Sequence, residues 1–207
     1  MEFLKKSIIL FVFITVFQVS NGQSQLQIQM SAFDSSYKLE KAAKYLDAIN
    51  SIKAIYDESS YEMNMRLGWL NYLVGQQTTS IGFYAKAIKT NPFSIEARFG
   101  YVMPASVLGN WEMVKNQYLE ILKIDDKNTK ANYNVGLIYY NSKDYVKAHK
   151  YFEVCANLYP FDYDSIHMYA WSCYFLGQLR EAKVLFSKCL LIKPNDKSAT
   201  DGYSLIK

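Results

Sequence analysis

Residues 163–196 decide the fold, and they read YDSIHMYAWSCYFLGQLREAKVLFSKCLLIKPND. Apolar side chains recur at helical spacing in two runs, which are separated by Gly177 and closed by Pro194. A helical period that is interrupted by a glycine and ended by a proline is typical of two amphipathic helices joined by a tight turn. The stretch therefore predicts a helical hairpin.

The hairpin pattern recurs every 34 residues between residue 61 and residue 196, without an inserted residue. Apart from Asp126 and Lys143, each repeated position keeps one kind of side chain. The columns are Pro194, Pro160, Asp126 and Pro92; Phe186, Phe152, Tyr118 and Tyr84; Gly177, Lys143, Gly109 and Gly75; Ala182, Ala148, Val114 and Ser80; and Ala170, Gly136, Val102 and Gly68. A fixed period of this length predicts a stacked array of hairpins rather than one closed globule.

Residues 61–196 resemble the tetratricopeptide repeat family. The residues that carry the resemblance are Gly68, Tyr84, Ala87, Pro92, Tyr118, Gly136, Tyr139, Ala148, Phe152, Pro160, Ala170, Ala182, Phe186 and Pro194. The resemblance implies an all-α fold, a right-handed superhelix (solenoid) of helix-turn-helix repeats at residues 61–94, 95–128, 129–162 and 163–196. The second repeat departs most, because Val102 and Val114 replace small residues, so we expect its helices to lie further apart.

Helical segments are expected to cap the array at both ends, because an open stack needs a polar outer face for solubility. Within residues 23–60, an apolar helical face predicts one long helix from Ser36 to Asp57, the second half of a degenerate repeat. The alternating stretch Gln25–Met30 fits a short strand, a poor helix or a flexible leader. Residues 197–207 predict a short capping helix that starts near Ser198.

Residues 1–22 predict an export signal. Two lysines precede the apolar run Ile8–Val19, and small residues follow it up to Gly22. The run is shorter than the roughly 20 apolar residues of a spanning helix, so we expect cleavage after Gly22 rather than an uncleaved anchor. The mature chain is then exported, periplasmic or secreted, without stable membrane insertion.

The sequence offers few groups that could perform chemistry. Removal of residues 1–22 takes away two lysines and one glutamate, so the net charge falls from +4 to +3. This positive charge is too small and too evenly spread along the chain for nucleic-acid binding. His149 and His167 have no partner at metal-ligand spacing, and His149 is expected on the solvated surface. We therefore expect a protein that is not an enzyme and that has no cofactor and no metal.

Three cysteines allow two interpretations. Export implies an oxidising compartment, in which a disulfide between Cys155 and Cys173 would join a second helix to the following first helix. The alternative is that Cys155, Cys173 and Cys189 are small buried residues.

The family resemblance implies that the first helices line a concave groove. Its lining would be Met65, Trp69, Tyr72, Phe99, Met103, Tyr133, Leu137, Tyr140, His167, Trp171 and Tyr174. Aromatic residues at helical spacing are often core, whereas exposed aromatic patches mark binding sites. Some family members clamp a terminal carboxylate with a Lys and Asn set, of which only Lys130 and Asn134 match here.

The function expected from this groove is a non-enzymatic scaffold of the cell envelope. It would hold a peptide or a partner protein through Trp69, Tyr72, Tyr140, Trp171 and Tyr174. Two alternatives stay open: a glycan-binding protein that stacks sugar rings on the same aromatic groove, and a structural subunit that docks through one end of the stack.

Overall fold

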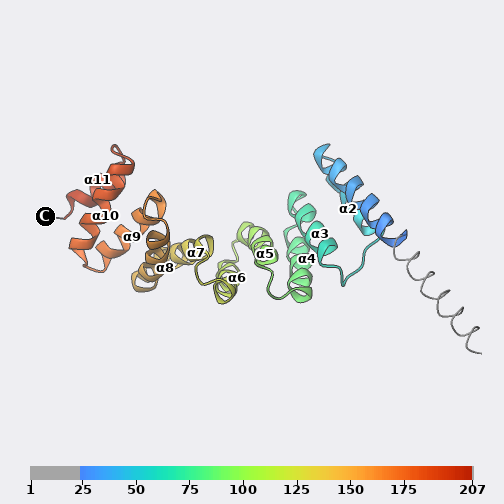
Figure 1. Cartoon of the computed structure of the whole chain (residues 1–207), viewed down its shortest axis with the longest axis horizontal. Coiled ribbons are helices and arrows are strands. Elements are labelled where there is room, and N and C mark those ends of the chain that lie inside the picture. Colours follow the sequence, from blue (N-terminus) through green and yellow to red (C-terminus); the bar gives the residue numbers. More distant parts are fainter. Residues whose placement is uncertain (1–23, 207) are drawn as a thin grey trace, which may run out of the picture. The chain divides into compact units, whose positions relative to one another are not determined.

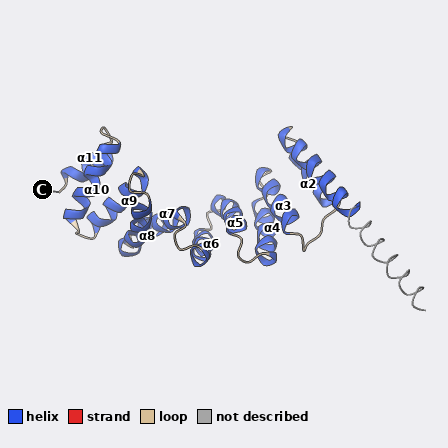
Figure 2. Cartoon of the chain, in the orientation of Figure 1, coloured by secondary structure: helices blue, strands red, loops and turns tan. Residues whose placement is uncertain are grey.

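The computed structural model describes residues 24–206, and every regular element in them is an α-helix (Figure 2). The all-α fold class is thereby confirmed. The expected export signal, residues 1–22, lies outside the described residues. Between residues 24 and 206 there is no helix long and apolar enough to cross a membrane.

The helices follow one another as hairpins (Figure 1). The first spans residues 24–41. The others are α2 (Tyr45–Lys53), α3 (Tyr61–Leu73), α4 (Gln77–Thr90), α5 (Ile95–Val107), α6 (Trp111–Ile124), α7 (Thr129–Asn141), α8 (Tyr145–Leu158), α9 (Tyr163–Phe175), α10 (Leu179–Ile192) and α11 (Lys197–Ser204). Helices α3, α5, α7, α9 and α11 start at residues 61, 95, 129, 163 and 197, so each enters in the same register.

The chain forms two compact units, which divide between Pro92 and Phe93. In the first unit α2 packs on α3 around a core of Ala48, Ile49, Ile52, Met63, Leu67 and Leu70. In the second unit each helix from α5 to α11 packs on the next. The C-terminal core of that unit is built around the buried rings of Phe152, Tyr169 and Phe186.

A side-chain cap starts the first helix of every hairpin from α3 onward. Ser60, Ser94, Asn128, Asp162 and Asp196 each accept a hydrogen bond from the backbone N–H three residues later. Such a cap satisfies one of the unpaired N–H groups at a helix start. The N-cap of the capping helix α11 is therefore Asp196. Ser198, where the sequence predicted the helix start, uses its hydroxyl in other hydrogen bonds.

The expected single helix from Ser36 to Asp57 is wrong, because the chain turns between residues 41 and 45. Ala43 has a positive φ of 56°, its N–H donates to the carbonyl of Glu40, and the N–H of Lys44 donates to the carbonyl of Leu39. This pair of bonds is the Schellman motif that ends a helix. Residues 24–53 are therefore a helical hairpin, and the stretch Gln25–Met30 is part of its first helix.

The same motif ends each later first helix, at Gly75, Gly109, Lys143 and Gly177, whose φ angles are 78°, 69°, 62° and 75°. Glycine adopts this left-handed conformation without the steric cost that a Cβ brings. The glycine column of the sequence is therefore a column of helix ends. The helix at residues 24–41 ends in the same way, but at an alanine, so the glycine pattern of the sequence did not indicate this helix end.

Lys143→Gly is expected to raise the free energy of unfolding of residues 93–206 by about 0.5–1 kcal/mol. The substitution removes the left-handed strain at φ 62°, and the greater freedom of glycine in the unfolded chain offsets part of the gain. Urea denaturation followed by circular dichroism measures it. The control Asn141→Gly, two residues earlier within α7, should lower stability; a loss of stability in Lys143→Gly would contradict the argument.

Candidate functional site

The eleven residues expected to line a groove all lie on first helices, and all are half-buried. Helix α3 carries Met65, Trp69 and Tyr72, α5 carries Phe99 and Met103, α7 carries Tyr133, Leu137 and Tyr140, and α9 carries His167, Trp171 and Tyr174. Because α3 belongs to the first compact unit and the others to the second, they form two sets.

In the first unit, Trp69 is tied to the first helix of the chain. Its indole Nε1 donates to Glu40 Oε1 at 2.7 Å, and its ring lies 5.8 Å from that of Tyr72. Glu40 also pairs with the buried Arg66, whose Nε donates to Ser36 Oγ at 3.0 Å. The polar edge of Trp69 is therefore used within the fold.

The electrostatics at Glu40 follow from these contacts. Partial burial would by itself raise the pKa of its carboxyl, but the hydrogen bond from Trp69 and the ion pair with Arg66 outweigh burial and hold the pKa below its ordinary value of 4.5. The carboxylate is therefore charged at neutral pH.

In the second unit the aromatic side chains gather around Phe175, at the end of α9. Its ring stacks on Tyr145 at 4.4 Å and lies 6.0 Å from Tyr140 and 5.9 Å from Trp171. Together with Tyr174, at 5.5 Å, these residues form the Phe175 cluster. Phe175 keeps 45% of its surface exposed, so the cluster offers an apolar patch to solvent.

Trp171 and His167 are anchored to the capping helix α11. Ser198 Oγ lies 2.8 Å from His167 Nε2 and 3.1 Å from Trp171 Nε1. Burial lowers the pKa of His167, against the opposing charges of Asp196 and Asp164, so the imidazole is neutral at neutral pH. These two residues contribute packing and ring faces rather than free polar groups.

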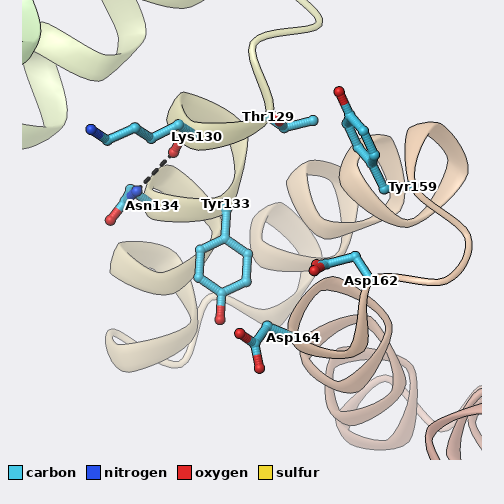
Figure 3. Close-up of a pocket in the computed structure, with 7 residues that line it drawn as sticks. All are labelled: Thr129, Lys130, Tyr133, Asn134, Tyr159, Asp162 and Asp164. Atoms are coloured by element: carbon cyan, nitrogen blue, oxygen red, sulfur yellow. Dashed lines mark hydrogen bonds between the residues drawn. The ribbon is translucent and has the colours of Figure 1, made fainter. Parts of the chain in front are cut away.

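A cavity of about 380 Å³ opens where α7 meets the junction of α8 and α9 (Figure 3). It is lined by Thr129, Lys130, Tyr133, Asn134, Tyr159, Asp162 and Asp164. Tyr133 is the one member of the expected groove among these residues. Lys130 and Asn134, the two matches to the carboxylate clamp, also lie on α7. Sequence reasoning missed Tyr159 and Asp162, which come from the loop that joins two repeats, and Thr129 and Asp164 at the starts of α7 and α9.

The charges of this cavity are separated. In Figure 3 the hydroxyl of Tyr133 points toward Asp164, while Lys130 and Asn134 point away from the two aspartates. Lys130 Nζ lies over the ring of Phe99, 4.4 Å from its centroid. Burial, and after it the charges of Asp164 and Asp162, raise the pKa of Tyr133. One side of the cavity is therefore aromatic and negative.

Of the two interpretations of the cysteines, small buried thiols are confirmed, and the possible disulfide between Cys155 and Cys173 is not formed. Cys155, Cys173 and Cys189 are buried free thiols, and Cys155 Sγ donates to the carbonyl of Thr129 at 3.5 Å. Burial raises the pKa of Cys155 to about 11 and those of the other two to about 12. The three are small core residues that stay protonated at neutral pH.

His149 is not a solvated surface residue, as the sequence suggested, but half-buried between α8 and α9. Its imidazole, the Cys173 thiol and the Glu181 carboxylate lie within 4.8 Å of one another. These three groups could hold a metal ion. Sequence spacing could not reveal them, because each comes from a different helix.

Comparisons with known proteins agree with the repeat architecture. Tetratricopeptide repeat family models match residues 129–162 and 163–196. No curated protein matches the chain.

Solved structures that resemble the chain share its fold. A tetratricopeptide repeat protein from Parabacteroides merdae ATCC 43184 is 19% identical with a TM-score of 0.72, over 87% of this chain and 72% of that one. MamA is 18% identical with a TM-score of 0.69, over 81% and 93% of the two chains. YrrB, described as a tetratricopeptide repeat protein with an unusual peptide-binding site, is 12% identical with a TM-score of 0.67, over 84% and 90%.

The helix starts, the recurrent caps and the helix ends all repeat with the period of the sequence, and two successive repeats match the family models. Residues 129–196 are therefore two tetratricopeptide repeats, and the chain shares the fold of tetratricopeptide repeat proteins.

Proposed function

We propose that this chain is a non-enzymatic scaffold that binds an extended segment of a partner protein through residues 93–206. Tetratricopeptide repeats are in general protein interaction modules. The observation that carries the finer proposal is the cavity beside Tyr133, with its two tyrosines and two aspartates. The peptide-binding site named for the structurally similar YrrB supports a peptide as the ligand.

The cavity suits a basic side chain of the partner. Asp162 and Asp164 supply negative charge, and Tyr133 and Tyr159 supply aromatic faces. Lysine and arginine bind carboxylates by charge-assisted hydrogen bonds and aromatic faces by cation–π attraction. Lys130, which would repel such a side chain, is held over Phe99 instead.

The Phe175 cluster suits an apolar side chain of the same segment. Tyr133 and Tyr140 lie seven residues apart on α7, and both rings contact Phe152. Seven residues of helix rise by about 10 Å, a distance that an extended segment covers with three or four residues. We therefore infer a motif in which a basic residue and an apolar residue stand three or four positions apart.

Selection from a random peptide display library on the immobilised chain tests this motif. The expected result is enrichment of a basic and an apolar residue at that spacing. Asp164→Asn should weaken the selected peptides about tenfold, since one charge-assisted contact is lost. Phe175→Ala should remove the apolar preference.

The matched control is Asp126→Asn, which changes an exposed aspartate outside the cavity and should leave binding unchanged. Equal weakening by Asp126→Asn and Asp164→Asn would overturn the assignment of the cavity. Failure to enrich any peptide, with binding on a glycan array instead, would favour the sugar-stacking alternative.

Export to the periplasm or the exterior is part of the same proposal. It rests on the two lysines and the apolar run of residues 1–22. N-terminal sequencing of the chain isolated from its own cells should then find Gln23 as the first residue, and retention of Met1 would refute it.

A further inference from the structure

Three metal-ligating side chains meet between three successive helices of the second unit. His149 comes from α8, Cys173 from α9 and Glu181 from α10, and one candidate ligand atom of each lies within 4.8 Å of the others. Cys173 is fully buried. None of these residues takes part in the cavity beside Tyr133 or in the Phe175 cluster.

One atom of this group is left without a partner. His149 Nε2 is buried and has no hydrogen-bond partner in the described structure. A buried polar atom of this kind is destabilising unless something satisfies it. In the tautomer that carries its proton on Nδ1, Nε2 has a free lone pair that can bind a metal ion.

Tyr169 contacts two of the three groups, Glu181 and His149. The hydroxyl of Tyr169 donates to Glu181 Oε1 at 2.7 Å, and its ring meets the imidazole of His149 edge to face at 4.9 Å. Glu153 lies close enough for its charge, like that of Glu181, to act on the thiol of Cys173. Outer residues that orient ligands in this way are typical of metal centres.

We propose that His149, Cys173 and Glu181 bind a divalent transition-metal ion, with Zn²⁺ as the best fit. Imidazole, thiolate and carboxylate are the ligand types of zinc, whereas magnesium and calcium prefer oxygen alone. Neighbouring ligand atoms of a tetrahedral zinc centre lie about 3.5 Å apart. Small rotations of the side chains would therefore close the present site, with water as the fourth ligand.

Binding requires the Cys173 thiol to become a thiolate. Its S–H bond breaks, the S–Zn bond forms, and one proton leaves to solvent for each ion bound. Burial, and after it the negative charges of Glu181 and Glu153, oppose this ionisation in the metal-free protein, and the charge of the dication favours it.

The ion would join α8, α9 and α10. A ligand that binds only the folded protein raises its melting temperature by mass action. Bound zinc would therefore stabilise the third and fourth repeats, which contain the Phe175 cluster and the cavity beside Tyr133.

Titration of the full, metal-free chain with Co²⁺ tests the site. A single thiolate ligand should give a sulfur-to-cobalt charge-transfer absorption that saturates at one ion per chain, and Zn²⁺ should displace it. Cys173→Ala is expected to abolish the absorption. The matched control Cys189→Ala removes another fully buried thiol of the same core and should keep it.

A second variant, Glu181→Gln, tests the site even if Cys173→Ala fails to fold. Glu181 is exposed, and glutamine can still accept the Tyr169 hydrogen bond. This variant should keep its circular dichroism and bind Co²⁺ at least about tenfold more weakly. Unchanged Co²⁺ affinity in Glu181→Gln, or loss of the absorption in Cys189→Ala, would overturn the proposal.

Discussion

Phe152→Ala is expected to lower the free energy of unfolding of residues 93–206 by about 3–5 kcal/mol. Phe152 is completely buried. Its ring lies 5.7 Å from Tyr133 and 6.4 Å from Tyr140. A Cβ at Gly136 would stand 2.7 Å from Phe152, so the ring fills the space that glycine leaves. Truncation therefore removes apolar burial and leaves a cavity.

Urea denaturation measures the effect, with hydrogen exchange to show which helices open, because repeat arrays need not unfold in one step. The control is Val146→Ala on the same helix, whose side chain is 67% exposed and should change stability by less than about 0.5 kcal/mol. Since Tyr133 and Tyr140 rest on Phe152, peptide binding should weaken as well. Similar small effects in both variants would show that the core of this unit lies elsewhere.

Glu40→Ala is expected to lower the free energy of unfolding of residues 24–92 by about 2–3 kcal/mol. Arg66 is only 6% exposed, and Glu40 pairs with it while accepting the indole N–H of Trp69 at 2.7 Å. Removal of the carboxylate leaves a buried guanidinium without its counter-charge. We place the effect below that of a fully buried pair because about a quarter of the Glu40 side chain is exposed.

The matched control removes an exposed ion pair on the same helix. Asp34 pairs with Lys38 at 2.7 Å, and both side chains are mostly exposed. Asp34→Ala should therefore change stability by less than about 0.5 kcal/mol. Equal losses in Asp34→Ala and Glu40→Ala would mean that burial of Arg66 does not decide the effect.

The contribution of Glu40 to the free energy of unfolding also depends on pH, and it decreases in acid. Because the folded pKa lies below the ordinary 4.5, the stabilisation is fully present above pH 4.5 and is lost as the pH falls through the lower, folded value. As the pH falls from 4.5 through the folded pKa, Glu40→Ala should therefore lose less of its free energy of unfolding than the original chain, as denaturation curves at each pH measure. A steeper loss in the variant would contradict this.

The repeat fold could be predicted because its information is local. Three signals act within one hairpin: helical periodicity, the glycines that end first helices, and the prolines that close hairpins. These signals recur every 34 residues along the chain. Ala43 and Lys143 adopt the same left-handed turn without glycine. Lys143 stands 34 residues from Gly109 and Gly177, whereas Ala43 lies outside this spacing. Because alanine seldom adopts a positive φ, no residue type at this position indicated the turn.

The aromatic face could be predicted only in part. The sequence placed Tyr140, Trp171 and Tyr174 on first helices, which is where they lie. It missed Phe175 and Tyr145, which stack across the ends of α9 and α8. Periodicity places residues on a helix face but says nothing about how the ends of two helices meet.

Between residues 61 and 192 the sequence by itself determined the helices and their register, because these depend on side chains within a few residues of one another. Three features form only through tertiary packing. They are the cavity beside Tyr133, the ion pair of Arg66 with Glu40, and the cluster of His149, Cys173 and Glu181. The members of each group come from different helices or from the loop between two repeats. Distances across packed helices depend on the volumes and rotamers of every side chain between them, which no single spacing in the sequence encodes.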